Sequence, residues 1–208
     1  MSLGEELLLR EGCFFELIDT AGAGFEEETG GAARGVSGGG KGPGILQDFS
    51  TLNRGQARLT ARIVAELVTV FKIPPSEIGV VTPYNAHASL LRDSLQALAD
   101  SSGVPAMADV EVATVDGFQG REKTAIVLDA VRSNPDAQVG FLADYRRLNV
   151  GLTRAKRKLV LVADSATLSS DPLWDVLFTF AASAGSAGIE GEAASRSVYS
   201  LPCADLLE

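Results

Sequence analysis

Two stretches of the chain carry most of the side chains whose chemistry suits phosphate and sugar. The first is Val112–Lys123 (VATVDGFQGREK) and the second is Arg146–Lys156 (RRLNVGLTRAK). In the first, Gly117 and Gly120 allow the backbone to approach a ligand and present N–H groups to phosphate oxygens. In the second, a projecting guanidinium can stabilise charge that develops on a γ-phosphate. Together they predict a surface that binds a nucleotide or a nucleic-acid backbone.

The polar residues beside the glycine pair strengthen this interpretation. Gln119 and Glu122 can hydrogen-bond sugar hydroxyls or water, and Arg121 or Lys123 supplies positive charge. A glycine pair with charges around it is, on its own, typical of a solvated turn. Its position directly after an apolar strand favours a ligand site.

The second stretch predicts a helix over residues 144–156, with Asp144 as its N-cap. Leu148, Leu152 and Ala155 form an apolar stripe that packs inward. Arg147 and Arg154 are seven residues apart, which is two helical turns, so they are expected to share a face with Gly151 between them. We expect Arg154 to be functional, whereas a functional role and a solvated basic face are equally good explanations of residues 156–158.

A third candidate segment is Thr82-Pro83-Tyr84, which ends an apolar strand. A hydroxyl and a ring there suit contact with a sugar–phosphate backbone and base stacking. The alternative is a strand-ending turn with a half-buried tyrosine. His87, the only histidine, has no serine or cysteine at a suggestive spacing, so a structural or surface role is expected.

One apparent phosphate-binding loop is rejected. Gly35–Lys41 (GVSGGGK) fits the first seven positions of the P-loop pattern, but Gly42 stands where a hydroxyl is needed for magnesium. No buried strand precedes the segment, and Pro43-Gly44 prevents a helix from following it. The chain therefore carries only part of a nucleotide site.

Composition is consistent with a folded domain that has a local basic region. Apolar residues make up 46% of the chain, and the net charge is −9. Residues 121–158 nevertheless hold nine bases and four acids, and local charge matters more than net charge for a polyanion. The chain has two cysteines, far apart, which indicates a reducing compartment, cytoplasm or nucleus. No apolar run approaches the roughly 18 residues needed to cross a membrane, so no membrane contact is expected.

The elements that must position these residues alternate between strand and helix. Strands are predicted near residues 14–18, 78–82, 110–115, 124–131 and 158–163, and helices near 53–71, 85–99, 144–156 and 171–178. This order predicts an α/β fold with three layers, a mainly parallel sheet flanked by helices on both faces. Thr82–Tyr84, Asp116–Gly120 and Arg132–Asn134 are then expected at one edge, beyond the carboxyl ends of the strands.

The chain divides into three parts. Residues 1–50 hold a first strand and a flexible loop rich in glycine and glutamate at the domain edge. Residues 51–182 form the main domain. Residues 183–208 are a tail rich in small residues that is expected to be disordered.

With these motifs in place, the segment from about Thr51 to Phe180 resembles the second RecA-like domain of superfamily 1 helicases of the nonsense-transcript-regulator and senataxin type. Ile78–His87 resembles motif IV, Glu111–Lys123 motif V, and Gly140–Lys156 motif VI. Three long motifs in order make the resemblance specific. It covers roughly 130 residues, and residues 20–45 and 183–208 match nothing in it.

The resemblance implies a 5′-to-3′ ATP-dependent helicase that acts on RNA or single-stranded DNA. ATP with Mg²⁺ would bind between two RecA-like domains. The first domain, absent from this chain, would carry the Walker A lysine, the Walker B acids and the Mg²⁺ ligands. This chain alone is therefore expected to be inactive.

The resemblance also implies residue roles. Arg154 is the arginine finger on the γ-phosphate, Glu122 contacts the ribose, Gly120 and Arg121 line the nucleotide cleft, and Gln119 couples the cleft to the strand. Contacts with the nucleic-acid backbone fall on Thr82, Pro83, Tyr84, Thr114, Val115 and Asp116. Arg147 supports motif VI, with Asp116 or another acid as its partner.

The sequence departs from the family pattern at three positions. His87 stands where glutamine is usual, which puts a nucleic-acid contact there in doubt. Gly151 replaces alanine, at a cost of about 0.5–1 kcal/mol in a helix interior. Gln56 replaces glutamate and can still cap a helix. A stand-alone nucleic-acid-binding module or a scaffold without motor activity remains the alternative function.

Overall fold

A six-stranded sheet forms the centre of the molecule. The structure is a computed structural model that describes residues 14–29, 51–102, 104–184 and 197–202. The strands lie in the order β5 (Glu111–Thr114), β4 (Ile78–Thr82), β6 (Lys123–Asp129), β7 (Ala155–Ala163), β1 (Phe14–Asp19) and β8 (Ser197–Pro202). The first five strands are parallel, and β8 is antiparallel to β1.

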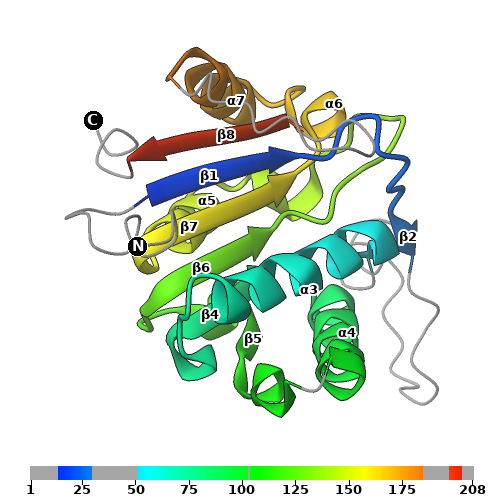
Figure 1. Cartoon of the computed structure of the whole chain (residues 1–208). Helices are drawn as coiled ribbons and strands as arrows, with labels where there is room; N and C mark the ends of the chain where they lie inside the picture. The colour runs from blue at the N-terminus through cyan, green and yellow to red at the C-terminus, as the bar shows by residue number, and fades with distance from the viewer. Residues whose placement is uncertain (1–13, 30–50, 103, 185–196, 203–208) are drawn as a thin grey trace.

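Helices cover both faces of this sheet (Figure 1). The helices α3 (Arg54–Thr69) and α4 (Asn85–Ser102) pack on one face, and α5 (Tyr145–Leu152), α6 (Ser165–Leu168) and α7 (Pro172–Ala184) pack on the other. The predicted three-layer α/β fold of the RecA type is confirmed.

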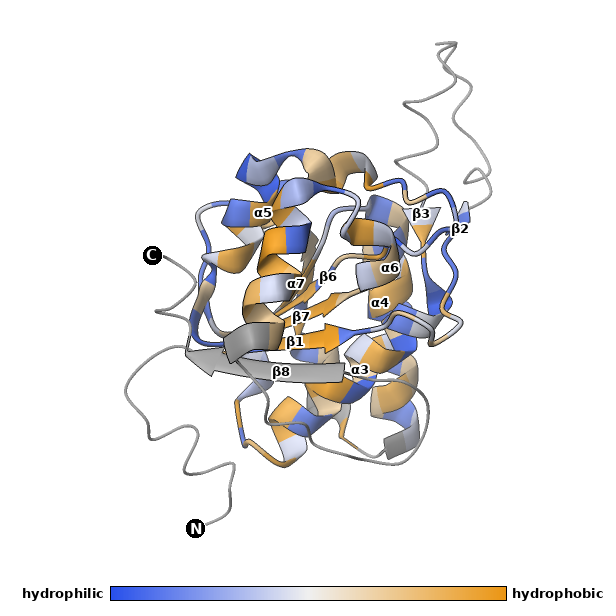
Figure 2. Ribbon diagram, turned by 90° about the horizontal axis from the view of Figure 1, so that it is seen from above, coloured by the Kyte–Doolittle hydropathy of each residue, from blue (hydrophilic) through white to orange (hydrophobic). Residues whose placement is uncertain are grey.

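The central strands alternate between two apolar cores. Leu128 of β6 packs with Leu148 and Trp174 in the core beneath α5 and α7, whereas the adjacent Val127 packs with Val64 in the core beneath α3 and α4. Both cores appear in Figure 2 as apolar residues on the strands and on the inward faces of the helices. Burial on both faces explains the continuous apolar runs in the sequence.

Helix α3 begins where the sequence predicts, but its cap is only half of a capping box. Asn53 Oδ1 accepts the Gln56 N–H at 3.0 Å. The Gln56 side chain does not return to Asn53. It donates to Thr20 Oγ1 at 3.2 Å and accepts the Val131 N–H at 2.9 Å. Gln56 therefore ties α3 to the segments that follow β1 and β6.

Helix α5 is shorter than the predicted helix over 144–156. Asp144 caps it as expected, through the Arg146 N–H at 3.0 Å, but the helix ends at Leu152 with Thr153 as its C-cap. Strand β7 begins at Ala155, where the backbone pairs with β6 in place of a further helical turn. Arg147 and Arg154 therefore do not share a helix face, and that prediction is wrong.

Short elements complete the described part of the chain. The 3-10 turns are η1 (Pro75–Glu77), η2 (Pro105–Asp109), η3 (Asp116–Phe118) and η4 (Gly140–Ala143), and β2 (Glu28–Thr29) pairs with β3 (Thr51–Leu52). The rejected loop, Gly35–Lys41, lies outside the described residues, as do both cysteines.

Strand β8 lies within the tail 183–208, for which composition predicts disorder. That expectation does not hold for residues 197–202, because their backbone pairs with β1 from Ser197 to Pro202. Pairing with a sheet edge supplies backbone hydrogen bonds even where the flanking sequence is poor in large apolar residues. Composition averaged over the tail hides this short strand.

Candidate functional site

The start of β6 and the start of β7 bring two candidate residues together. Lys123 pairs with Ala155 in the parallel register, and the Lys123 N–H donates to the Arg154 carbonyl oxygen at 3.1 Å. Glu122 and Arg154 each precede their strand by one residue. They therefore lie beside each other at the amino ends of β6 and β7.

The Arg154 side chain is half-buried at the end of α5. Its Nε donates to the Val150 carbonyl oxygen at 3.0 Å, and its Nη2 donates to Thr153 Oγ1 at 2.9 Å. A cation is favoured at this end of a helix because the last carbonyl groups have no helical partners. Arg154 thus has a defined resting position and is not enclosed in the core.

The loop from Gln119 to Glu122 is exposed. Gly120 has φ = +79°, a conformation that only glycine adopts readily, and a Cβ there would meet no atom within 4 Å. Within the described residues, the side chains of Gln119 and Glu122 have no hydrogen-bond or ion-pair partner. The loop can therefore offer an open backbone, an amide and a carboxylate to a sugar hydroxyl.

Arg121 pairs with Glu111, at the start of the edge strand β5. Lys123 Nζ lies 3.2 Å from the other Glu111 oxygen. Burial raises the pKa of Glu111, but hydrogen bonds from Arg121 and Lys123 outweigh burial, so the pKa lies below the ordinary value of 4.5. A phosphate would have to compete with this carboxylate for Arg121.

At the carboxyl end of β4, two expected nucleic-acid contacts are buried. Thr82 and Tyr84 are 0% and 1% exposed, and Thr82 Oγ1 has no hydrogen-bond partner among the described residues. The Tyr84 ring packs on Phe141, 5.8 Å between centroids. The expectation that this hydroxyl and ring face a nucleic-acid strand is therefore not met. Pro83, which is half-buried, reaches the surface.

The side chains at the carboxyl end of β5 range from buried to exposed. Val115 is buried, and its N–H donates to the Thr82 carbonyl oxygen at 3.0 Å. Thr114 is half-buried, and its Oγ1 accepts the Gly117 N–H at 3.2 Å. Asp116 is exposed, and its Oδ1 lies 3.5 Å from Arg147 Nε. The expected pair between Arg147 and Asp116 is present.

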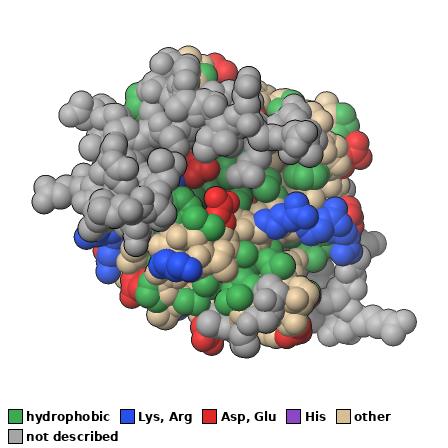
Figure 3. Space-filling view, in the orientation of Figure 1, with side chains coloured by type: hydrophobic (Ala, Val, Ile, Leu, Met, Phe, Trp, Pro, Cys, Tyr) green, Lys and Arg blue, Asp and Glu red, His purple; other side chains and the backbone are tan. Residues whose placement is uncertain are grey.

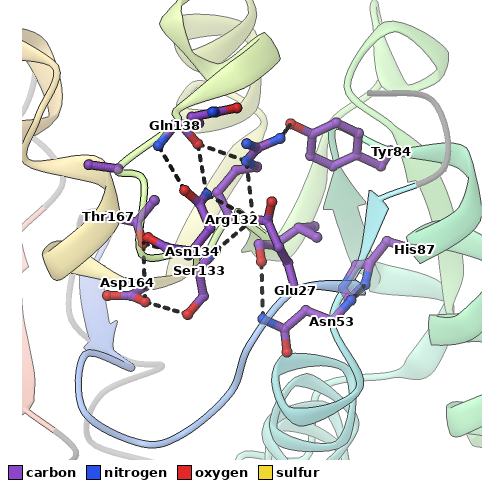
Figure 4. A network of polar contacts seen from close by, with 12 residues as sticks. Glu27, Asn53, Tyr84, His87, Arg132, Ser133, Asn134, Gln138, Asp164 and Thr167 are labelled. Carbon is purple, nitrogen blue, oxygen red and sulfur yellow. Dashed lines mark hydrogen bonds and ion pairs between the residues drawn. The ribbon is translucent and has the colours of Figure 1, made fainter. Parts of the chain in front are cut away.

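Next to this edge lies a buried polar network centred on Arg132, 4% exposed (Figure 4). Its Nε donates to the Gln138 carbonyl oxygen at 2.9 Å and lies 3.2 Å from Glu27 Oε2, and its Nη1 lies 3.4 Å from the Tyr84 hydroxyl. Glu27 also accepts the Ser133 N–H at 2.9 Å. The position of Arg132 after a buried strand signals an edge residue, but nothing in the sequence links it to Glu27.

His87 belongs to a second buried network and is 0% exposed. Its Nδ1 accepts the Asn53 N–H at 3.1 Å, so the proton of the neutral ring is on Nε2, 3.0 Å from Asp129 Oδ2. This contact is close but poorly aligned for a hydrogen bond, and Thr60 Oγ1 donates to the same oxygen at 2.7 Å. The expected structural role of His87 is confirmed.

A comparison with known families decides the affiliation. A family model described as an AAA domain matches residues 36–166. The chain belongs to this family. Within it, the chain is the second RecA-like domain of a superfamily 1 helicase of the nonsense-transcript-regulator and senataxin type.

Curated relatives of this helicase domain match over a limited part of their length. The chain is 38% identical over 130 residues to regulator of nonsense transcripts 1 of Dictyostelium discoideum, covering 62% of the chain and 10% of the relative. It is 43% identical over 130 residues to ATP-dependent helicase NAM7 of Saccharomyces cerevisiae (62% and 13%). It is 37% identical over 167 residues to DNA-binding protein SMUBP-2 of Mus musculus (79% and 14%). The chain thus spans 10–14% of the length of these relatives.

The candidate residues of the helicase domain form two groups at opposite ends of the sheet. Thr82 and Thr114 are paired in register at the carboxyl ends of β4 and β5, whereas Lys123 and Ala155 are paired at the amino ends of β6 and β7. The segment 115–122 returns along one face of the sheet, with Phe118 buried in the core beneath α5 and α7. The prediction that Asp116–Gly120 lies at the carboxyl edge with Thr82 therefore holds for Asp116, just after β5, and is wrong for Gln119 and Gly120, which lie close to the start of β6.

The described residues contain neither a helix that could span a membrane nor a cluster of possible metal ligands. None of their helices is long and apolar enough to cross a membrane. Nor do three or more of their histidine, aspartate or glutamate side chains gather as a possible metal site.

Proposed function

We propose that this chain is the C-terminal motor domain of an ATP-dependent RNA or DNA helicase, and that ATP with Mg²⁺ binds between it and a first RecA-like domain of the full-length protein. The observation that carries the proposal is the hydrogen bond from the Lys123 N–H to the Arg154 carbonyl oxygen, 3.1 Å. This bond brings the backbone of residues 122–123 next to that of Arg154, so an arginine, a glutamate and a glycine loop adjoin one another at this edge. The name of the yeast relative, an ATP-dependent helicase, supports the same reaction.

In this proposal the amino edge forms one wall of the nucleotide pocket. Glu122 accepts hydrogen bonds from ribose hydroxyls, and Gly120 allows the phosphates to approach the backbone. Arg154 neutralises charge on the γ-phosphate as its bond to the leaving oxygen breaks. Arg121 lines the nucleotide cleft, and Gln119 couples this cleft to the bound nucleic-acid strand. The Mg²⁺ ligands and the Walker lysine lie on the first domain.

The carboxyl edge is the proposed grip on single-stranded nucleic acid. Pro83, Thr114 and Asp116 reach the surface there, while Thr82, Tyr84 and Val115 hold them from below. ATP draws Arg154 and Glu122 against the first domain and closes the cleft, and loss of the γ-phosphate releases them. The carboxyl edge then grips and releases the nucleic-acid backbone in turn, which moves the nucleic-acid strand.

The test measures ATP turnover after the upstream RecA-like domain is supplied, in the presence of a polynucleotide. We expect Arg154→Ala to reduce kcat by about 10³-fold or more, as for other arginine fingers. Arg154→Lys is expected to restore only part of the activity, because lysine keeps the charge but not the planar fork.

Arg62→Ala is the matched control. In Figure 3 lysine and arginine side chains gather over α3, and Arg54, Arg58 and Arg62 are exposed on this helix, on the other face of the sheet from α5. Arg62 has no side-chain partner among the described residues, so its loss should leave turnover unchanged. Equal turnover for wild type and Arg154→Ala would refute the assignment, as would an equal loss in the control. A stand-alone binding module would bind polynucleotide without turnover that depends on Arg154.

A further inference from the structure

Tyr145, the first residue of α5, is an exposed aromatic side chain. It is 60% exposed, whereas the other large apolar side chains exposed in the described part are Val70, Leu173 and Val176, all aliphatic. A single exposed apolar residue needs no functional explanation by itself. The neighbours of the Tyr145 ring and its position in the fold distinguish it from the three exposed aliphatic residues.

Arg146 lies beside the Tyr145 ring at the surface. Arg146 Nε donates to the Tyr145 hydroxyl at 3.4 Å, and its guanidinium carbon lies 5.7 Å from the ring centroid. Both side chains are exposed. An exposed ring with a guanidinium beside it matches the two requirements of single-strand binding, which are a stacking surface for a base and a cation for a phosphate.

The pair lies at the proposed nucleic-acid edge. Just before it, the Phe141 ring packs on Tyr84, at the carboxyl end of β4. Just after it, Arg147 pairs with Asp116 and lies 4.9 Å from the Phe141 centroid. The proposed nucleotide residues are at the other end of α5, about 12 Å away for eight helical residues. Tyr145 therefore lies at the edge of the sheet that is proposed to bind nucleic acid, away from the edge that is proposed to bind ATP.

We propose that Tyr145 and Arg146 form a base-stacking site for single-stranded nucleic acid that extends the grip of the carboxyl edge. The ring of Tyr145 stacks on one base, and Arg146 contacts an adjacent phosphate. The inference rests on the proposed function for its ligand class and adds residues to it that the family motifs leave unassigned. Because every base has a π-face, the site is tolerant of base sequence.

The experiment measures binding of fluorescently labelled dT12 and dA12 to this chain by anisotropy, over a series of salt concentrations. Tyr145→Ala is expected to weaken binding roughly 5-fold or more for both oligonucleotides, with an unchanged salt slope, because stacking releases no counterions. Tyr145→Phe is expected to keep wild-type affinity. Arg146→Ala is expected to weaken binding and to reduce the slope of log K against log salt by about 0.7.

Val176→Ala, at an exposed aliphatic residue of α7, is the matched control, and thermal unfolding of each variant confirms that it folds.

Wild-type affinity for Tyr145→Ala would overturn the stacking site and leave the proposed helicase function intact. Equal losses for Tyr145→Ala and Tyr145→Phe would also overturn it, since they would assign the effect to the hydroxyl. A wild-type chain with no affinity for either oligonucleotide would overturn both this site and the proposed grip. Weaker association of Tyr145→Ala with the first domain, at unchanged oligonucleotide affinity, would assign the residue to the domain interface and overturn the stacking site.

Discussion

At the scale of the residue, Arg154 has an anchored but only half-buried side chain, as its proposed role on the γ-phosphate requires. Its guanidinium donates to the Val150 carbonyl oxygen and to Thr153 Oγ1, so its orientation is set before any ligand arrives. These partners are weak competitors for a phosphate, because a charge-assisted bond to an anion is stronger than a bond to a neutral oxygen. Sequence alone predicts that this arginine is accessible but not which atoms hold it.

Burial is the residue property that the sequence predicts least well. The sequence of Thr82-Pro83-Tyr84 predicts side chains that reach a ligand at the surface, yet two of the three side chains are buried. The cause is distant in the chain, because Phe141 and Arg132 close over Tyr84. A local pattern cannot report which later segment will cover it.

The Glu111 cluster gives a prediction at this scale. Because the pKa of Glu111 is lowered in the folded state, its ion pairs stabilise the fold above the ordinary value of 4.5, and this contribution is lost as pH falls through the folded-state pKa. We expect Glu111→Gln to lower stability at pH 7 by up to about 1 kcal/mol, as for a partly exposed pair. The difference from wild type should vanish at acid pH.

Urea unfolding midpoints at neutral and acid pH measure this effect. Glu66→Gln is the control, since Glu66 is an exposed carboxylate on α3 with no side-chain partner among the described residues. A wild-type midpoint for Glu111→Gln at pH 7, or a loss of equal size at both pH values, would contradict the expectation.

At the scale of the element, the crossing segment 115–122 decides the layout of the site. It connects the carboxyl end of β5 to the amino end of β6 with only the short 3-10 turn η3 between them, and Phe118 of this turn packs against β4 at Gly79. The sequence predicts the strands on either side of this segment, because their apolar runs are continuous. It does not predict the crossing, because a segment of eight residues with a single 3-10 turn carries no periodic signal.

Gly79→Ala tests this packing. A Cβ at Gly79 would lie 2.7 Å from Phe118 Cζ and 2.8 Å from Ile126 Cδ1, and both of these side chains are fully buried. We expect the substitution to lower the free energy of unfolding by about 1–3 kcal/mol through overpacking, even though alanine is a better strand residue than glycine. Chemical denaturation measures the change.

A second variant identifies the cause of that loss. In the Gly79→Ala background, Phe118→Leu shortens the side chain that meets the new methyl group, so the double variant should lose less stability than the sum of the two single losses. Additive losses would mean that Phe118 does not press on β4. A Gly79→Ala variant as stable as wild type would mean that the close approach does not exist.

At the scale of the whole molecule, the sheet separates two proposed tasks. The proposed nucleotide residues lie where β6 and β7 begin, and the proposed nucleic-acid residues lie where β4 and β5 end, with α5 running between the two edges. The order of the main strands and helices from β1 to α7, and a sheet covered by helices on both faces, are predicted from the sequence, whereas the added edge strand β8 is not. The division of the motifs between two edges is not predicted either, because it depends on the register of parallel strands. Because the proposed nucleotide pocket has only one wall on this chain, the proposal requires a first RecA-like domain as the other wall.

ATP turnover by this chain alone, by the first RecA-like domain alone and by the two together, with polynucleotide present, tests the central claim most directly. The proposal predicts no turnover by this chain, low turnover by the first domain, and a saturable increase when wild-type chain is added but not when Arg154→Ala is added. Turnover by the purified chain alone would contradict it. So would a first domain whose turnover does not respond to this chain at any concentration at which the two associate.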